Sequence, residues 1–220
     1  LLVGESLVPA VIPILKRLGI EDETAAFSRV KPGVSFIWSP TDRFSFTFAR
    51  FAPVVFPYAY NIPRPRFDEA MLARAVASGV KRVVTHARLE PVTEEGGELR
   101  LARETLAAAP ALGGRQPDLI VDATGRARLG ARALKIPAQL GPRNDVAHFA
   151  HFENFGWDEA PGQVLIRRLE AGWAWCIPLQ DRLSVGIVVG RQDCARLGAS
   201  PAERLERAIA ADFWLSAIAS

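Results

Sequence analysis

Apolar residues recur with two different periods in the first third of the chain. Between Pro9 and Gly19 they stand three and four positions apart, which predicts a helix with one buried face that ends at the glycine. From Val34 to Phe48 they alternate with other residues on both sides of a Ser-Pro-Thr-Asp turn. Strict alternation is typical of strands, so this stretch predicts a β-hairpin with one aromatic face on each strand.

The middle of the chain combines helical and extended patterns. Phe67 to Ser78 predicts a helix capped by Gly79, with Leu72, Ala75 and Val76 on its inner side. Extended segments are expected at Arg82 to Ala87 and, after a Gly96-Gly97 turn, at Leu99 to Thr105. The apolar run from Leu119 to Val121 predicts a buried parallel strand that runs into a loop.

The last third of the chain predicts an antiparallel meander within residues 164–190. Its three strand-like segments, joined by short turns, are Val164 to Leu169, Trp173 to Leu179 and Leu183 to Val189. Ser200 and Glu203 then form a capping box around a proline at the first helical position. The summed prediction is one α/β domain over residues 1–220 that contains an antiparallel sheet.

Composition narrows the class of protein. With 220 residues, 49% apolar and 23% charged, the chain can form one sizeable core. Its net charge of +3 is dispersed, so we expect no nucleic-acid partner. The sequence holds no apolar run long enough for a membrane span and no signal peptide. Two cysteines, Cys176 and Cys194, cannot form a disulfide framework, which favours a reduced, cytoplasmic protein.

Several common motifs are absent from the sequence. It contains no Gly-x-Gly-x-x-Gly, no phosphate loop, no His-Glu-x-x-His and no Cys-x-x-Cys. His148 and His151 would lie on opposite faces of a strand, so two satisfied structural histidines are favoured over a shared metal. The chain begins without Met and closes on an unfinished helical pattern, from which we expect an internal piece of a longer protein.

Several segments together resemble known flavoproteins. Val3–Pro9, Asn61–Asp68 and the Asp-Leu-Ile-Val-Asp-Ala-Thr-Gly run of Asp118–Gly125 resemble the FAD-dependent oxidoreductases of the glutathione-reductase-like group, in the same order. Gly172–Pro178 matches the Trp-x-Trp-x-Ile-Pro signature of the flavin-dependent, tryptophan-halogenase-like family. The resemblance implies a fragment of a glutathione-reductase-like α/β framework that binds FAD, with an antiparallel β-sheet as its substrate layer.

The resemblance also implies site residues. Lys31, ahead of an apolar strand, stands at the place of the family's catalytic lysine. Trp173 and Trp175 would line the substrate pocket and keep an organic substrate away from the flavin, so that a halide is oxidised instead of the substrate being hydroxylated. The residues expected to contact the cofactor are Glu5, Arg64, Ala87, Asp122 and Gly125.

The family's chemistry implies reactants and partners. It uses FAD as FADH2, delivered by a flavin reductase, and oxidises chloride or bromide to hypohalous acid that the lysine passes to a small aromatic substrate, free or tethered to a carrier. The chain lacks the family's N-terminal glycine-rich fingerprint and its C-terminal Gly-Asp flavin segment. This part alone is therefore expected to hold FAD poorly.

Other interpretations stay open at this point. Without the resemblance, Lys31 is a solvated turn lysine, Trp173 and Trp175 pack in a sheet, Asp122 is a cap and Gly125 is a turn glycine. An FAD-dependent monooxygenase or a reductase of the geranylgeranyl-reductase type shares the framework and needs no lysine. A third alternative is a non-catalytic module that resembles a flavin-binding protein.

Overall fold

The computed structural model describes residues 3–93, 97–153 and 155–218. The chain divides into two compact units, which are described separately: Leu1–Ala75 with Arg143–Ser220, and Val76–Pro142. No described helix is long and apolar enough to cross a membrane. Both cysteines are buried and unpaired, as expected. The single domain expected from the sequence stays a prediction, since both units can belong to one domain of a longer chain.

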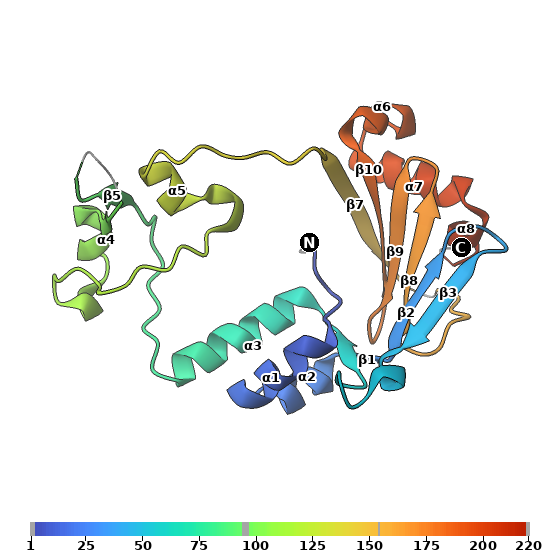
Figure 1. Cartoon of the computed structure of the whole chain (residues 1–220), viewed down its shortest axis with the longest axis horizontal. Coiled ribbons are helices and arrows are strands. Elements are labelled where there is room, and N and C mark those ends of the chain that lie inside the picture. The colour runs from blue at the N-terminus through green and yellow to red at the C-terminus, as the bar shows by residue number, and fades with distance from the viewer. Residues whose placement is uncertain (1–2, 94–96, 154, 219–220) are drawn as a thin grey trace. The chain divides into compact units, whose positions relative to one another are not determined.

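A six-stranded sheet organises the first unit (Figure 1). Its strand order is β3-β2-β8-β9-β10-β7, and every neighbouring pair is antiparallel except β2 with β8. The predicted hairpin and meander are both confirmed. The strand bounds are Gly33–Ile37 (β2), Arg43–Thr47 (β3), Asp145–Phe152 (β7), Val164–Leu169 (β8), Gly172–Pro178 (β9) and Leu183–Gly190 (β10).

Helices cover one face of this sheet. Apolar side chains of α7 (Pro201–Ala211) and α8 (Phe213–Ile218) pack with those of β8, β9 and β10 into the main core, and α6 (Cys194–Leu197) adds to it. The predicted capping box opens α7: the Glu203 N–H donates to Ser200 Oγ at 3.1 Å, and the Glu203 carboxylate accepts from the Ala199 N–H at 2.8 Å. This face of the sheet therefore carries the main core of the unit.

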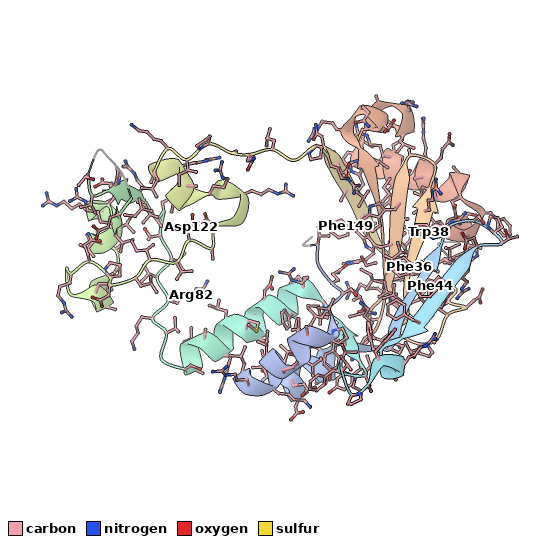
Figure 2. All side chains as sticks on the ribbon, viewed as in Figure 1. Phe36, Trp38, Phe44, Arg82, Asp122 and Phe149 are labelled. Carbon is pink, nitrogen blue, oxygen red and sulfur yellow. The ribbon has the colours of Figure 1, made fainter. Side chains whose placement is uncertain are left out.

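The opposite face of the sheet is rich in aromatic residues. Phe36 and Phe44 lie on the hairpin, with Trp38 just beyond β2, and Phe149 lies on β7 (Figure 2). Phe149 packs against Trp175 of β9. On β2 the burial alternates, so that Ser35 and Ile37 face the core while the aromatic side remains partly exposed. The aromatic faces expected from the alternation exist, but they lie away from the main core.

The N-terminal helices form a second, smaller core in the first unit. A short 3-10 turn, Pro9–Val11, leads into α1 (Ile12–Leu18), which ends at Gly19 with a φ of +68°, followed by α2 (Glu21–Phe27). Strands β1 (Arg29–Lys31) and β4 (Ala59–Asn61) pair beside them. Buried Ile12, Leu15, Ile20 and Ile62 fill this core.

Helix α3, Arg64–Ala77, forms as predicted but buries a different face. Phe67 and Met71 pack against the second core and Ala70 is buried, whereas Leu72 and Val76, expected inside, are exposed. Both sets have helical spacing, and contact with the neighbouring core decides between them. Gly79 follows the helix with a φ of +98° and donates its N–H to Val76 O, as expected of a C-terminal glycine.

The second unit contains little regular structure. A two-stranded sheet pairs β5 (Leu89–Pro91) with β6 (Leu99–Leu101). The remaining elements are α4 (Arg103–Ala107), 3-10 turns at Pro110–Leu112 and Gly125–Ala127, and α5 (Leu129–Ala133). The extended run expected to reach Thr105 therefore stops at Leu101. The turn expected at Gly96-Gly97 lies partly outside the described residues, since Gly96 is not among them.

Two strands predicted for this unit are wrong. Neither Arg82–Ala87 nor Leu119–Val121 forms a strand, and the side chains of Val84, Leu119 and Val121 are 81%, 79% and 78% exposed. A strand needs a neighbour to pair with its N–H and C=O groups. No other strand lies beside either segment in the described part of the unit. An apolar pattern in the local sequence is therefore not sufficient for these segments to form strands.

Candidate active site

A cavity of about 430 Å³ opens on the aromatic side of the sheet in the first unit. We call it the tryptophan cavity. It brings together four residues that the sequence singled out: Glu5 from the segment before α1, Lys31 from the end of β1, and Trp173 and Trp175 from β9. Val3, Gly4, Ser6, Val34, Ala147, Val164, Ile166, Ile177 and Val188 complete its lining.

The two tryptophans form one wall of this cavity. They lie on the same face of β9 with ring centroids 5.9 Å apart, and Trp175 Nε1 donates to Ser184 Oγ at 3.3 Å. Gly186 of β10 stands directly opposite Trp175, and a Cβ there would overlap the indole ring. Gly186 is therefore a site residue that sequence reasoning missed. The sequence did contain an indication of this, because a glycine inside a predicted strand often marks a place where another group approaches the backbone closely.

Lys31 is a buried amine, only 5% exposed. Its Nζ donates to Leu7 O at 3.1 Å and lies 5.4 Å from the centroid of the Phe48 ring. Among the described residues, no carboxylate forms an ion pair with Nζ. Burial lowers the pKa of Lys31 from 10.5 to about 8. The alternative of a solvated turn lysine is wrong. The amine can instead lose its proton close to neutral pH.

Phe48 also lines a second, apolar hollow. We call it the phenylalanine groove, a space of about 640 Å³. It is lined by Val8, Pro9, Ala10, Phe46, Phe48, Arg50, Phe51, Ala52, Val54 and Val55. Lys31 lines the tryptophan cavity, and its amine contacts Phe48 of the groove. One lysine is thus a neighbour of both spaces.

The Glu5 side chain is 3% exposed, and its carboxylate contacts a histidine of β7, the strand at one edge of the sheet. Its Oε1 lies 2.8 Å from Nε2 of His151 on β7, and its backbone O accepts from the Ile62 N–H at 2.7 Å. His148 lies on the opposite face of β7, and its buried Nε2 has no partner. The expectation of two satisfied histidines is therefore wrong for His148. Within the described ranges no cluster of side chains suits a metal ion.

Arg64 binds the segment that carries Glu5. Its Nη1 donates to Val3 O at 2.8 Å, while Nε and Nη2 donate to the carboxylate of Asp68. Gly4, with a φ of +95°, allows this approach, since a Cβ there would collide with the guanidinium. Most of the donors of Arg64 are thus engaged within the chain. Its expected contact with the dinucleotide stays a prediction.

The other three expected cofactor contacts, Ala87, Asp122 and Gly125, lie in the second unit. Asp122, shown in Figure 2, accepts from Thr124 N at 3.0 Å, from Thr124 Oγ1 at 2.6 Å and from Gly130 N, in the first turn of α5, at 2.7 Å. Bonds from Thr124 and Gly130 hold the pKa of Asp122 below its ordinary value. Asp122 acts here as a cap, and Gly125, with a φ of +57°, begins a 3-10 turn. Cofactor contact by all three residues stays a prediction.

Comparison with known proteins identifies the family. The tryptophan halogenase family model matches residues 52–212, which is most of the chain. The chain belongs to the tryptophan halogenase family. Among similar curated proteins, flavin-dependent halogenase armH4 of Armillaria mellea is 27% identical over 202 residues, and otaD of Aspergillus carbonarius is 25% identical over 205. These alignments cover 84% and 86% of this chain but 38% and 41% of the relatives.

Solved structures of halogenases share the mixed α/β fold. The myxobacterial chondrochloren halogenase CndH, described as an FAD-dependent halogenase, is 27% identical with a TM-score of 0.71, covering 99% of this chain and 51% of that one. A flavoprotein/dehydrogenase from Cytophaga hutchinsonii, 20% identical with a TM-score of 0.75, shares the fold over 100% of this chain and 54% of its own. The chain thus spans about half of each of these structures.

The flavin-dependent relatives imply FAD as the cofactor of this halogenase family member. The tryptophan cavity fits the flat ring of a flavin in two respects. Trp173 and Trp175 offer an aromatic wall, and the buried Oγ of Ser6, which lines the same cavity, has no hydrogen-bond partner. A buried hydroxyl without a partner is costly unless a ligand or water satisfies it. The cavity volume also lies within the range of about 300 to 1,000 Å³ that is common for ligand sites.

Proposed function

We propose that the whole protein is a flavin-dependent halogenase that uses reduced FAD, oxygen and a halide to halogenate a small aromatic substrate. The observation that carries the proposal is the position of Lys31, a buried amine that lines the tryptophan cavity and contacts Phe48 of the phenylalanine groove. Reduced FAD would supply two of the four electrons that reduce oxygen, and the halide would supply the other two as it is oxidised to hypohalous acid. The flavin would lie near Glu5, Ser6 and the tryptophan wall.

Lys31 takes hypohalous acid from one space and presents it to the other. As an ammonium it hydrogen-bonds the acid and polarises it, and as a neutral amine it forms a haloamine. A pKa of about 8 makes both forms accessible near neutral pH. Leu7 O accepts from Nζ and restrains the amine. The lysine thereby confines a diffusible oxidant to one route.

The tryptophan wall separates the organic substrate from the flavin. Trp175 is fixed by Ser184 and by the space that Gly186 leaves, and Trp173 packs against it. Two adjacent indoles exclude a bulky substrate while leaving room for a halide ion. This supports halide oxidation over hydroxylation of the substrate.

The phenylalanine groove supports an aromatic substrate. Phe46, Phe48 and Phe51 offer edges and faces to an aromatic ring, and the lining contains one charged residue, Arg50. The substrate is free or carrier-tethered, and a separate flavin reductase supplies FADH2. An FAD monooxygenase or a geranylgeranyl-reductase-like enzyme is the second candidate, because the flavoprotein/dehydrogenase from Cytophaga hutchinsonii shares the fold. A non-catalytic flavin-binding-like module is the third.

The test uses the full-length protein with a flavin reductase, NADH, chloride or bromide and a library of aromatic compounds, and detects products by their isotope pattern in mass spectrometry. Lys31→Ala should abolish halogenated product while FAD binding and flavin reoxidation persist. Lys31→Arg should fail too, because a guanidinium cannot provide a neutral amine. Lys16→Ala, which removes an exposed lysine of α1, is the matched control.

Each result separates the candidates. Lys31→Ala with more than about a tenth of the normal halogenation, a barrier change below about 1.4 kcal/mol, would reject the assignment of Lys31. Hydroxylated or reduced product without halide dependence would favour the monooxygenase or reductase. A full-length protein that retains no FAD would exclude both enzymatic candidates and leave the non-catalytic module.

A further inference from the structure

Glu5 borders a second cavity besides the tryptophan cavity. This second space, of about 420 Å³, is here called the histidine cavity, and Phe27, Pro63, Arg66, His151, Asp181 and Arg182 are among its lining residues. Of the described residues, Glu5 is the one that lines both cavities. His151 lines the histidine cavity but not the tryptophan cavity, and its Nε2 lies 2.8 Å from the Glu5 carboxylate. The pair therefore connects two spaces that are otherwise lined by different residues.

The two members of the pair differ in their access to solvent. The Glu5 side chain is 3% exposed and that of His151 is 19% exposed. Solvent therefore reaches the His151 side chain more easily than the Glu5 side chain. An imidazole is suited to pass a proton between solvent and a carboxylate because its ordinary pKa, about 6.5, lies near neutral pH.

Other charged groups surround the pair. Asp181 and Arg182 follow β9 and form an ion pair with each other. The hydrogen bond from Arg182 holds the pKa of Asp181 below its ordinary value, and the charge of His151 adds to this effect. Arg66 of α3 stacks on Phe27 at 4.8 Å in the histidine cavity. Lys31 is the one cationic residue that lines the tryptophan cavity with Glu5 in the described part of the chain.

We propose that His151 and Glu5 form a proton path from the histidine cavity to the tryptophan cavity. This rests on the proposed function, in which halide oxidation has to be supplied with protons. Oxidation of one halide ion by oxygen and reduced FAD yields oxidised FAD, one hypohalous acid and one water, and consumes one proton. The later reaction of hypohalous acid with an aromatic C–H gives a carbon–halogen bond and water, with no net proton.

The path moves one proton per turnover. The His151 imidazolium donates its Nε2 proton to Oε1 of Glu5 and becomes neutral imidazole. Glu5, now a carboxylic acid, releases the proton to the oxygen that leaves as water in the tryptophan cavity and returns to a carboxylate. Solvent in the histidine cavity protonates the imidazole again. Glu5 is a catalytic residue in this scheme, and His151 is a positioning residue that acts through it.

Chemical rescue tests the path in the full-length protein. Hypohalous acid is trapped with an added β-diketone. His151→Ala should lower the rate of halide oxidation about 100-fold, within the usual range for a lost acid–base group. Imidazole in the buffer should restore the rate, because the shortened side chain leaves space in the histidine cavity. Rescue by methylimidazoles should follow the pKa of the added base, which a purely structural role of His151 does not predict.

Two further variants complete the experiment. Glu5→Gln keeps the shape of the side chain but carries no transferable proton, so it should lose activity and not respond to imidazole. His148→Ala removes the histidine on the opposite face of β7, outside both cavities, and should show no imidazole dependence. Retention of FAD and an unchanged circular dichroism spectrum establish that each variant is folded.

Nuclear magnetic resonance gives a readout that needs no turnover. The imidazole resonances of His151 are identified by their loss in His151→Ala. In Glu5→Gln the chemical shifts of the His151 ring nitrogens should change, because the carboxylate that faces Nε2 at 2.8 Å is replaced by an amide. Unchanged shifts would show that the two side chains are not in contact.

The outcomes separate the proton path from the proposed function. If the wild-type protein halogenates but His151→Ala retains more than about a tenth of its rate, or loses it without imidazole rescue, the path is refuted and the halogenase stands. If the wild-type protein oxidises no halide while the resonances of His151 still respond to Glu5→Gln, the proposed function fails and the path falls with it.

Discussion

Replacement of Lys31 by methionine should change how the stability of the first unit depends on pH. Burial lowers the pKa of Lys31 from 10.5 to about 8. At 1.36 kcal/mol per pKa unit, this shift corresponds to about 3 kcal/mol of stability lost when the buried amine is charged. Methionine has a similar length and no charge, but it leaves Leu7 O without its donor, at a cost of about 1 kcal/mol. Lys31→Met should therefore be about 2 kcal/mol more stable than wild type at pH 7.

The direction of this pH dependence follows from whether the folded and the unfolded chain hold the Lys31 proton. Between about pH 8 and about pH 10.4, the unfolded chain holds the Lys31 proton and the folded chain has lost it. The wild-type free energy of unfolding should therefore rise with pH across this window and stay level below it. Above the window the amine is neutral in both states. Lys31→Met should then be less stable than wild type, by about the 1 kcal/mol of the lost hydrogen bond.

Urea unfolding followed by tryptophan fluorescence measures this difference. All five tryptophans lie in the first unit, so the signal reports the part of the chain that contains Lys31. Lys81→Met, which removes an exposed lysine, should track wild type at every pH. A stability difference between wild type and Lys31→Met that stays constant from pH 7 to about pH 10.4 would refute the reasoning, because the lysine would then titrate equally in both states.

Two more perturbations address other parts of the sheet. Gly186→Ala should displace the indole of Trp175 and cost about 1 to 3 kcal/mol, measured by urea unfolding; an unaltered stability and tryptophan spectrum would contradict the close packing. Burial, and then the charge of Arg204, hold the pKa of His148 below its ordinary value. Wild type should therefore lose stability as pH falls below about 6.5, and His148→Phe should reduce that loss in melting temperatures recorded between pH 7 and pH 5.

Elements formed between neighbours in the chain were predictable from local sequence. The hairpin, the meander and the cap at Ser200 depend on alternation, short turns and one side-chain acceptor, and all three are confirmed. The presence of Trp173 and Trp175 on one face of a strand follows from the same period of two. The family could also be recognised, since its signature is a continuous run of residues.

Tertiary structure decided what depends on distant partners. Arg82–Ala87 and Leu119–Val121 have the residues of strands, yet neither has a neighbour to pair with in the described part of its unit. Glu5 and His151 are 146 positions apart, and no local pattern predicts their contact. The sequence around Lys31, before a Pro-Gly turn, is typical of a surface lysine. In the folded chain the amine is buried beside Leu7 O and the Phe48 ring, and the burial lowers its pKa. Period and turn chemistry are local properties, whereas burial and pKa depend on the whole surroundings of a side chain, which only the folded chain provides.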